Sequence, residues 1–182
     1  EEVMSLSRVV VLVAGILKDL KPVVSPGITT ASLEILCKKR IEFHSKKWTI
    51  DRYPDFPTYL SISVNDTAAH GAPCEYTLRT GDIVTLDLVL RVNGWYGDAA
   101  VTVPVGAVKP EHAALIRAAG LATSRGIEKA RAGARIGDIG AEINEVAREY
   151  GCGVIENLIG HGIGRTLHEG PAVFSSGELG VG

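Results

Sequence analysis

The sequence predicts an α+β fold in which helices flank a largely antiparallel sheet. Apolar residues spaced three and four apart indicate paired helices, and alternating apolar residues indicate strands between them. Asn93-Gly94 lies between two apolar runs, a strong signal for a hairpin and therefore for antiparallel neighbours. The order helix, glycine-containing turn, shorter helix, strand and His-Gly occurs twice, ending at His70 and at His161. We therefore expect two related halves.

The amino-acid composition limits the classes of protein to which this chain can belong. The 182 residues are 46% apolar and 22% charged, which is enough for one globular domain with its own core. The net charge of −2 argues against a general nucleic-acid binder. The apolar run 9–17 is too short to span a bilayer. Three scattered cysteines indicate a reducing compartment without a disulfide framework, so we expect a cytoplasmic protein with no membrane segment.

The first part of the chain is expected to be helical. Residues 2–20 have the spacing of an amphipathic helix, which the following prolines end. A second helix is expected over about 31–44, capped by one of the two threonines that precede it. The basic residues 38–40 on this helix are interpreted as a solvated face. The prolines and aromatic residues of 49–59 indicate a structured loop.

The rest of the chain alternates between strands and helices. Strands are expected at 60–64, 83–90, 95–105 and 154–159, and helices at about 110–130 and 138–150. Pro110 suits the first turn of the first of these helices, and Asp138 is expected to cap the second. The last strand leads into the glycine-rich run 160–164.

Two aspartates of the expected hairpin are candidates for chemistry. Asp87 interrupts an apolar strand, where a charge is unfavourable unless it is paired or binds a metal. A two-residue turn at Asn93-Gly94 places Asp87 opposite Ala100, and Asp98 then lies diagonally on the same face, about 7 Å away at Cα. Two such carboxylates can converge on metal ions. The alternative is an ordinary hairpin aspartate that pairs with Arg91 or with solvent.

The histidines extend this set. His161 stands among glycines that allow close approach of backbone or substrate, and His168 follows seven residues later. A lone histidine is more often structural, but a glycine-rich turn after an apolar strand favours a functional role. No helix follows these glycines in the pattern of a dinucleotide-binding motif, and no P-loop is present. The candidate constellation is therefore His70, Asp87, Asp98, His161 and His168, whose oxygen and nitrogen donors suit Mn, Fe, Co or Zn.

Five motifs run in order along nearly the whole chain. They are Tyr53-Pro-x-Phe-Pro, Ser61-Ile-Ser-Val-Asn-Asp-x-x-x-His-Gly-x-Pro73, Gly81-Asp-Ile-Val-x-x-Asp87, Gly97-Asp98 and Gly160-His-Gly-Ile-Gly-Arg-x-x-His-Glu-x-Pro171. Together they resemble the methionine aminopeptidases and, more broadly, the pita-bread metallopeptidases. The resemblance implies a curved antiparallel sheet flanked by helices, with two pseudo-symmetric halves of which the second is incomplete. It also implies one metallopeptidase catalytic domain over residues 1–182.

The same resemblance implies roles for individual residues. Asp98 matches the carboxylate that bridges two divalent metal ions, Asp87 chelates one ion and His161 binds the other. His70 and His168 match the catalytic histidines that contact substrate and stabilise the transition state. The methionine pocket would be lined near Tyr53, Phe56, Ser61, His70 and Leu167. The implied reaction removes the N-terminal methionine of peptides and nascent proteins by a metal-activated water, in a monomer for which the ribosome is a further candidate partner.

The family's other two metal ligands are glutamates that lie well C-terminal to Pro171. The chain ends eleven residues after Pro171, with Glu178 as its only acid in that tail. Because it also begins at Glu1 without an initiator methionine, we expect a sequence incomplete at both ends. Two alternatives stay open, a truncated pseudoenzyme that binds peptide N-termini and an Xaa-Pro aminopeptidase or prolidase. The runs Ser-Val-Asn-Asp and Gly-Ile-Gly-Arg favour the methionine-specific branch.

Overall fold

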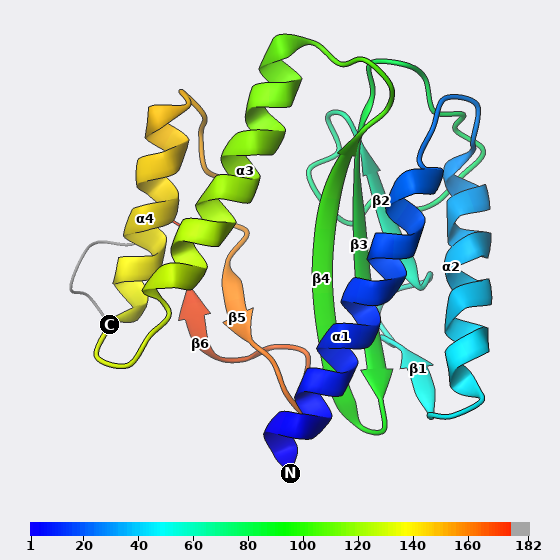
Figure 1. Ribbon diagram of the computed structural model, residues 1–182, viewed down its shortest axis with the longest axis horizontal. Coiled ribbons are helices and arrows are strands. Elements are labelled where there is room, and N and C mark those ends of the chain that lie inside the picture. Colours follow the sequence, from blue (N-terminus) through cyan, green and yellow to red (C-terminus); the bar gives the residue numbers. More distant parts are fainter. Residues whose placement is uncertain (176–182) are drawn as a thin grey trace. The chain divides into compact units, whose positions relative to one another are not determined.

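The computed structural model describes residues 1–175, so the predicted tail with Glu178 lies outside the described residues. The chain divides into two compact units (Figure 1). Unit 1 comprises Glu1–Lys109 and Ile163–Leu167. Within the described residues, unit 2 comprises Pro110–Gly162 and residues 168–175.

Two helices of unit 1 confirm the predicted N-terminal pair. They are α1 (Glu2–Leu20) and α2 (Thr30–Ser45), with a short 3₁₀ turn, η1 (Lys21–Val23), after α1. Of the two threonines considered, Thr29 is the cap, since its side-chain oxygen accepts a hydrogen bond from the Ser32 N–H at 3.1 Å. The two helices lie side by side, and α1 packs against the sheet (Figure 1).

The sheet of unit 1 is antiparallel throughout. Its strands are β1 (Ile50–Arg52), β2 (Leu60–Val64), β3 (Ile83–Val92) and β4 (Trp95–Pro104). β1 and β2 both pair with one side of β3, and β4 pairs with the other side. The strand β1 lies in the segment predicted as loop. It forms because β3 extends past β2 and offers unpaired backbone groups at Leu90–Val92.

The β3–β4 hairpin has the predicted register. Asn93 and Gly94 have positive φ angles of 49° and 85°, as a type I′ turn requires. Asp87 pairs with Ala100, and Val89 pairs with Asp98. The two aspartates therefore share one face of the hairpin, diagonally displaced.

Alternation along β3 separates the core from the site. Every second residue is buried against the helices, and these residues are Val84, Leu86, Leu88, Leu90 and Val92. The same cluster includes Val9, Val13 and Ile16 from α1 and Leu33 from α2. Asp87 is on the opposite face of β3, away from this core.

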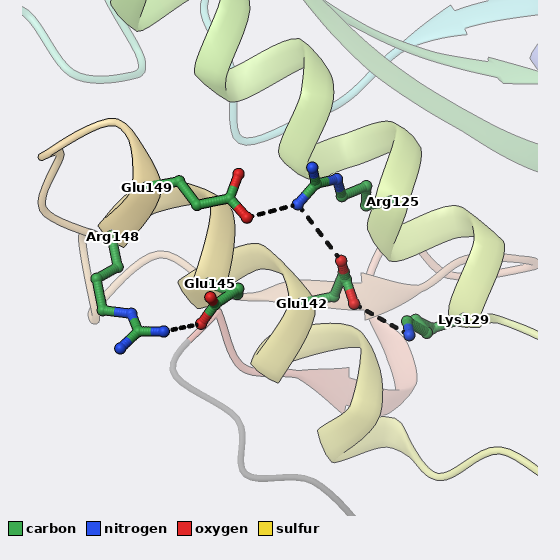
Figure 2. Close-up of polar contacts among 6 residues, drawn as sticks. All are labelled: Arg125, Lys129, Glu142, Glu145, Arg148 and Glu149. Atoms are coloured by element: carbon green, nitrogen blue, oxygen red, sulfur yellow. Dashed lines mark hydrogen bonds and ion pairs between the residues drawn. The ribbon is translucent and has the colours of Figure 1, made fainter.

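Unit 2 pairs two helices with a small hairpin. The helices are α3 (Pro110–Lys129) and α4 (Ile136–Glu149), and the strands are β5 (Gly160–Gly162) and β6 (Glu169–Val173). A Cβ atom on Gly126 of α3 would lie 3.3 Å from Ile139 of α4, so the glycine permits close packing. Charged side chains bridge the two helices (Figure 2). Arg125 of α3 lies 3.0 Å from Glu149, and Glu142 of α4 lies 3.0 Å from Lys129.

Two predictions for unit 2 are wrong. Arg135, not Asp138, is the N-cap of α4. The Asp138 carboxylate lies in the first turn and accepts a hydrogen bond from the Arg135 N–H at 2.9 Å. The strand predicted at 154–159 is instead an irregular segment, because strand pairing begins only at Gly160, opposite Val173 of the unexpected strand β6.

None of the helices in residues 1–175 combines the length and the apolar character needed to cross a membrane.

Candidate functional site

Asp87 and Asp98 form a carboxylate pair on the hairpin face opposite the core. Burial and, to a smaller extent, the negative charge of Asp98 raise the pKa of Asp87 to about 6, against the lowering effect of the charge of His70. The three side chains are thus close enough to influence one another. A cation bound at this pair would favour the ionised form of Asp87 and would therefore lower its pKa.

His70 is positioned by its own strained backbone. It has a positive φ of 58°, a conformation that non-glycine residues rarely adopt and that is concentrated at functional sites. The next residue, Gly71, accepts a hydrogen bond from the Ile62 N–H at 2.7 Å. A Cβ atom on Gly71 would lie 2.2 Å from the Ile62 carbonyl oxygen, which no side chain tolerates. Glycine at position 71 therefore allows the turn that contains His70 to lie directly against β2.

An aromatic cluster adjoins the carboxylates. Tyr53 contacts Phe56 and Tyr96 at ring-centroid distances of 6.1 and 6.0 Å, and Phe56 meets the His70 imidazole edge to face at 5.1 Å. A small pocket is lined by Tyr53, Phe56, Thr58, Tyr59, Ser61, Asp87 and Val89. Phe56 therefore links this pocket to His70.

The pocket contains three of the residues predicted to line the substrate site, namely Tyr53, Phe56 and Ser61. Sequence reasoning missed Thr58, Tyr59 and Val89. Val89 has a recognisable signal, since it lies two residues after Asp87 and so on the same strand face. Leu167, another predicted lining residue, is buried within unit 1 at 5% exposure.

Segment 163–167 also meets the hairpin through its backbone and its arginine. The Gly164 carbonyl accepts a hydrogen bond from the Tyr96 N–H at 2.8 Å. The guanidinium of Arg165 lies 4.2 Å from the centre of the Trp95 ring. The arginine of the Gly-His-Gly-Ile-Gly-Arg motif is therefore an anchor for this segment within unit 1.

His161 and His168 are brought together within unit 2. Their ring centroids are 4.4 Å apart in an edge-on arrangement. His161 Nδ1 lies 2.9 Å from the Gly162 carbonyl oxygen, which can only accept, so Nδ1–H donates there and in the neutral ring the lone pair is on Nε2. Gly162, like Gly71, allows a close approach of two backbone segments, because a Cβ atom there would lie 2.2 Å from the Gly170 carbonyl oxygen.

The predicted metal ligands thus divide between the units, with Asp87 and Asp98 in unit 1 and His161 in unit 2. Among residues 1–175, no three His, Cys, Asp or Glu side chains form a group that could hold a metal ion. The carboxylate pair nevertheless supplies the oxygen donors that suit a divalent cation.

Comparison with known proteins places this arrangement in a family. The profile of metallopeptidase family M24 matches residues 5–181, which is almost the whole chain. The chain belongs to metallopeptidase family M24. Methionine aminopeptidases are among its relatives within M24. The one from Rickettsia prowazekii is 38% identical over 87% of this chain, and the one from Clostridium perfringens is 40% identical over 90%.

The structural comparison agrees. A crystal structure of the Rickettsia prowazekii methionine aminopeptidase superimposes with a TM-score of 0.93 at 34% identity, covering all of this M24 chain and 73% of that one. The predicted pita-bread fold with its antiparallel sheet is therefore confirmed. The chain spans 61% and 66% of the lengths of the two relatives named above.

Proposed function

We propose that this chain carries the site of an N-terminal methionine aminopeptidase that uses divalent metal ions. The observation that supports it most directly is the Asp87–Asp98 pair, in which Asp87 is under the electrostatic influence of His70 and lines an aromatic pocket. The relatives named methionine aminopeptidase support the choice of substrate. The proposed substrates are the N-termini of peptides and nascent proteins in the cytoplasm.

In this proposal Asp87, Asp98 and His161 hold two divalent ions, with manganese, iron, cobalt or zinc as candidates. A bound divalent ion would supply a water of lowered pKa and polarise the carbonyl of the scissile bond. Tyr53, Phe56 and Ser61 receive the methionine side chain, and Leu167 adds to the apolar surroundings. Because the aromatic rings of Tyr53 and Phe56 present apolar surface, the pocket favours an apolar side chain.

The two remaining histidines act on the peptide itself. His70 stands beside Phe56 at the edge of the pocket, where its imidazole N–H can donate to an oxygen of the substrate as negative charge develops. His168 would serve the same purpose from unit 2, adjacent to His161. Imidazole suits this role because it donates or accepts a proton near neutral pH.

The test is release of methionine from a Met-Ala-Ser peptide, with and without added Mn or Co. We expect metal-dependent release that falls at least roughly 100-fold in Asp98→Ala, since even outer partners of a metal site are worth about 10–100-fold. Glu42→Ala, which removes an exposed carboxylate from α2, is the matched control and should retain the activity. Absence of release from folded protein at saturating metal would contradict the proposal.

A second candidate function is binding of peptide N-termini without catalysis. It is supported by the absence, within residues 1–175, of a preformed group of three metal-ligating side chains. Metal-independent binding of Met-Ala-Ser by calorimetry, without methionine release, would select this function. Prolidases share the fold alone, as the Pyrococcus horikoshii enzyme does at 18% identity, and cleavage of an Xaa-Pro peptide but not of Met-Ala-Ser would select that branch.

A further inference from the structure

We infer that Glu34 of α2 is the positioning residue for the wall of the substrate pocket, an inference that rests on the proposed function for its substrate. Glu34 is a buried acid, only 5% exposed, on the core-facing side of a helix. Burying a carboxylate is costly unless donors satisfy it. The identity of those donors shows what the side chain does.

Both donors are backbone groups at the start of β2. Glu34 Oε1 accepts a hydrogen bond from the Tyr59 N–H, and Oε2 accepts one from the Leu60 N–H, each at 3.0 Å. Lys38 Nζ also lies 3.5 Å from Oε1, but the lysine side chain is half exposed. The carboxylate therefore holds two consecutive amides in a charge-assisted fork.

These amides belong to the pocket wall. Tyr59 and Ser61 line the pocket on either side of Leu60, and Ser61 pairs with Asp87 in the sheet. A small rotation of β2 about Leu60 would therefore move the side chains of Tyr59 and Ser61. It would also disturb the pairing of Ser61 with Asp87. Both hydrogen bonds that Glu34 accepts from this wall come from backbone amides, so it acts on the pocket through the backbone.

The same edge of β2 is also hydrogen bonded to the turn that contains the catalytic candidate His70. The outward-facing amides of an antiparallel strand are two residues apart, and here they are Leu60 and Ile62. Leu60 donates to Glu34, while Ile62 donates to the Gly71 carbonyl, next to His70. Glu34 thus accepts the hydrogen bond of Leu60 that a neighbouring strand would otherwise accept. The His-Gly turn accepts the next one, from Ile62.

Glu34→Gln tests this role with almost no change in shape. The amide oxygen of glutamine can accept from one backbone N–H, but its NH₂ group must then face the other, which is left without an acceptor. Glu42→Gln is the matched control, since it makes the same change on an exposed position of the same helix. Both variants are compared with the wild-type chain at a temperature where near-UV circular dichroism shows all three folded.

The first readout is selectivity between Met-Ala-Ser and Leu-Ala-Ser. We expect Glu34→Gln to raise KM for the methionine peptide and reduce the Met/Leu ratio of kcat/KM by roughly tenfold, the cost of an unsatisfied buried amide. A merely structural loss of folded protein would lower kcat for both peptides equally and leave the ratio unchanged. An unchanged ratio in an active Glu34→Gln enzyme would overturn the inference while the proposed function stands.

The second readout does not depend on activity. Hydrogen exchange should speed up at the Tyr59 or Leu60 amide of Glu34→Gln and stay unchanged in Glu42→Gln. If the wild type releases no methionine but this change occurs, the proposed function fails and the positioning of β2 by Glu34 is supported. If Glu34→Gln does not fold, hydrogen exchange of the wild-type protein tests the inference instead. We expect the Leu60 amide to exchange as slowly as the Ile62 amide. Exchange of the Leu60 amide at the rate of a solvent-exposed amide would overturn the inference.

Discussion

Two aspartates of unit 1, the buried Asp82 and the partly buried Asp87, show how the surroundings of a carboxylate decide its chemistry. For Asp82, burial opposes ionisation, but hydrogen bonds from Asn65, from the Arg79 backbone and from Tyr76 outweigh it and lower the pKa. For Asp87, burial and the charge of Asp98 act together and raise the pKa to about 6. Hydrogen bonds within the protein therefore stabilise the negative charge of Asp82. The surroundings of Asp87 instead disfavour its negative charge, as is common at functional sites.

Replacement of Asp82 by asparagine tests the first case. Asp82 is 7% exposed, and the variant should lose about 1–3 kcal/mol of unfolding free energy at pH 7 because its donors lose a charged acceptor. A lowered folded-state pKa stabilises the protein above the unfolded pKa of about 3.9, and this contribution disappears as the pH falls through the folded pKa. The difference between wild type and Asp82→Asn should therefore shrink between pH 7 and pH 3.

Urea unfolding at several pH values measures this difference. Asp66→Asn, on an exposed position of the neighbouring loop, is the control and should follow the wild type throughout. A constant difference between wild type and Asp82→Asn across the pH range would show that the stabilisation is not linked to ionisation of Asp82.

At the level of elements, the contact between α1 and β4 depends on Gly97. A Cβ atom there would lie 2.6 Å from Val9 Cγ1 and 3.2 Å from the Val9 backbone, so no rotamer change alone can make room. Gly97 precedes Asp98, and the packing of the helix is therefore coupled to the strand that carries the carboxylate. Gly15, in the middle of α1, has no atom within 4 Å of the corresponding position.

The two glycines should respond oppositely to alanine. Gly15→Ala should stabilise the protein by about 0.5–1 kcal/mol, because alanine restricts the unfolded chain and favours the helix. Gly97→Ala should destabilise it by about 1–3 kcal/mol through overpacking. Thermal unfolding of both variants against the wild type gives the comparison, and a neutral Gly97→Ala would mean that α1 shifts without cost.

For the whole molecule, the two units differ in the size of their cores. Nearly all the buried apolar side chains of the described chain belong to unit 1, whereas unit 2 contributes only Ala118, Val146 and Ala147. The ion pairs between α3 and α4 are partly or fully exposed and contribute little each. Unit 2 is therefore expected to be the less stable of the two.

Denaturation followed by two probes tests this expectation. Both tryptophans of the chain, Trp48 and Trp95, belong to unit 1, so tryptophan fluorescence reports on that unit alone. Far-UV circular dichroism also reports on α3 and α4. We expect part of the dichroism to be lost at a lower urea concentration than the fluorescence change. Superimposable curves would show instead that the units unfold as one.

Local patterns predicted most of this fold, and the failures share a physical cause. Residues 2–20, strand 60–64 and the Asp87–Ala100 pairing follow from periodicity and turn chemistry, which act over short distances. The strands β1 and β6 depend on partners elsewhere in the chain, so composition alone could not reveal them.

The candidate site follows the same rule. Carboxylates and histidines were found by residue type and spacing, but Glu34 was missed, although it lies three residues before Cys37 and seven before Ile41 and so faces the core with them. The backbone amides that donate to its carboxylate lie 25 and 26 residues away in the sequence. Side chains that bind main-chain groups carry no motif, and only the folded chain reveals them.

The glycines after His70 and His161 set a limit on how the chain can vary. In a library randomised at positions 71 and 162, stable clones should retain glycine even without selection for activity, because a carbonyl oxygen occupies the space of any side chain. An inactive descendant of this protein could therefore lose its aspartates and histidines and still keep these two glycines. Their persistence in a sequence would record the ancestry of the fold rather than the survival of its chemistry.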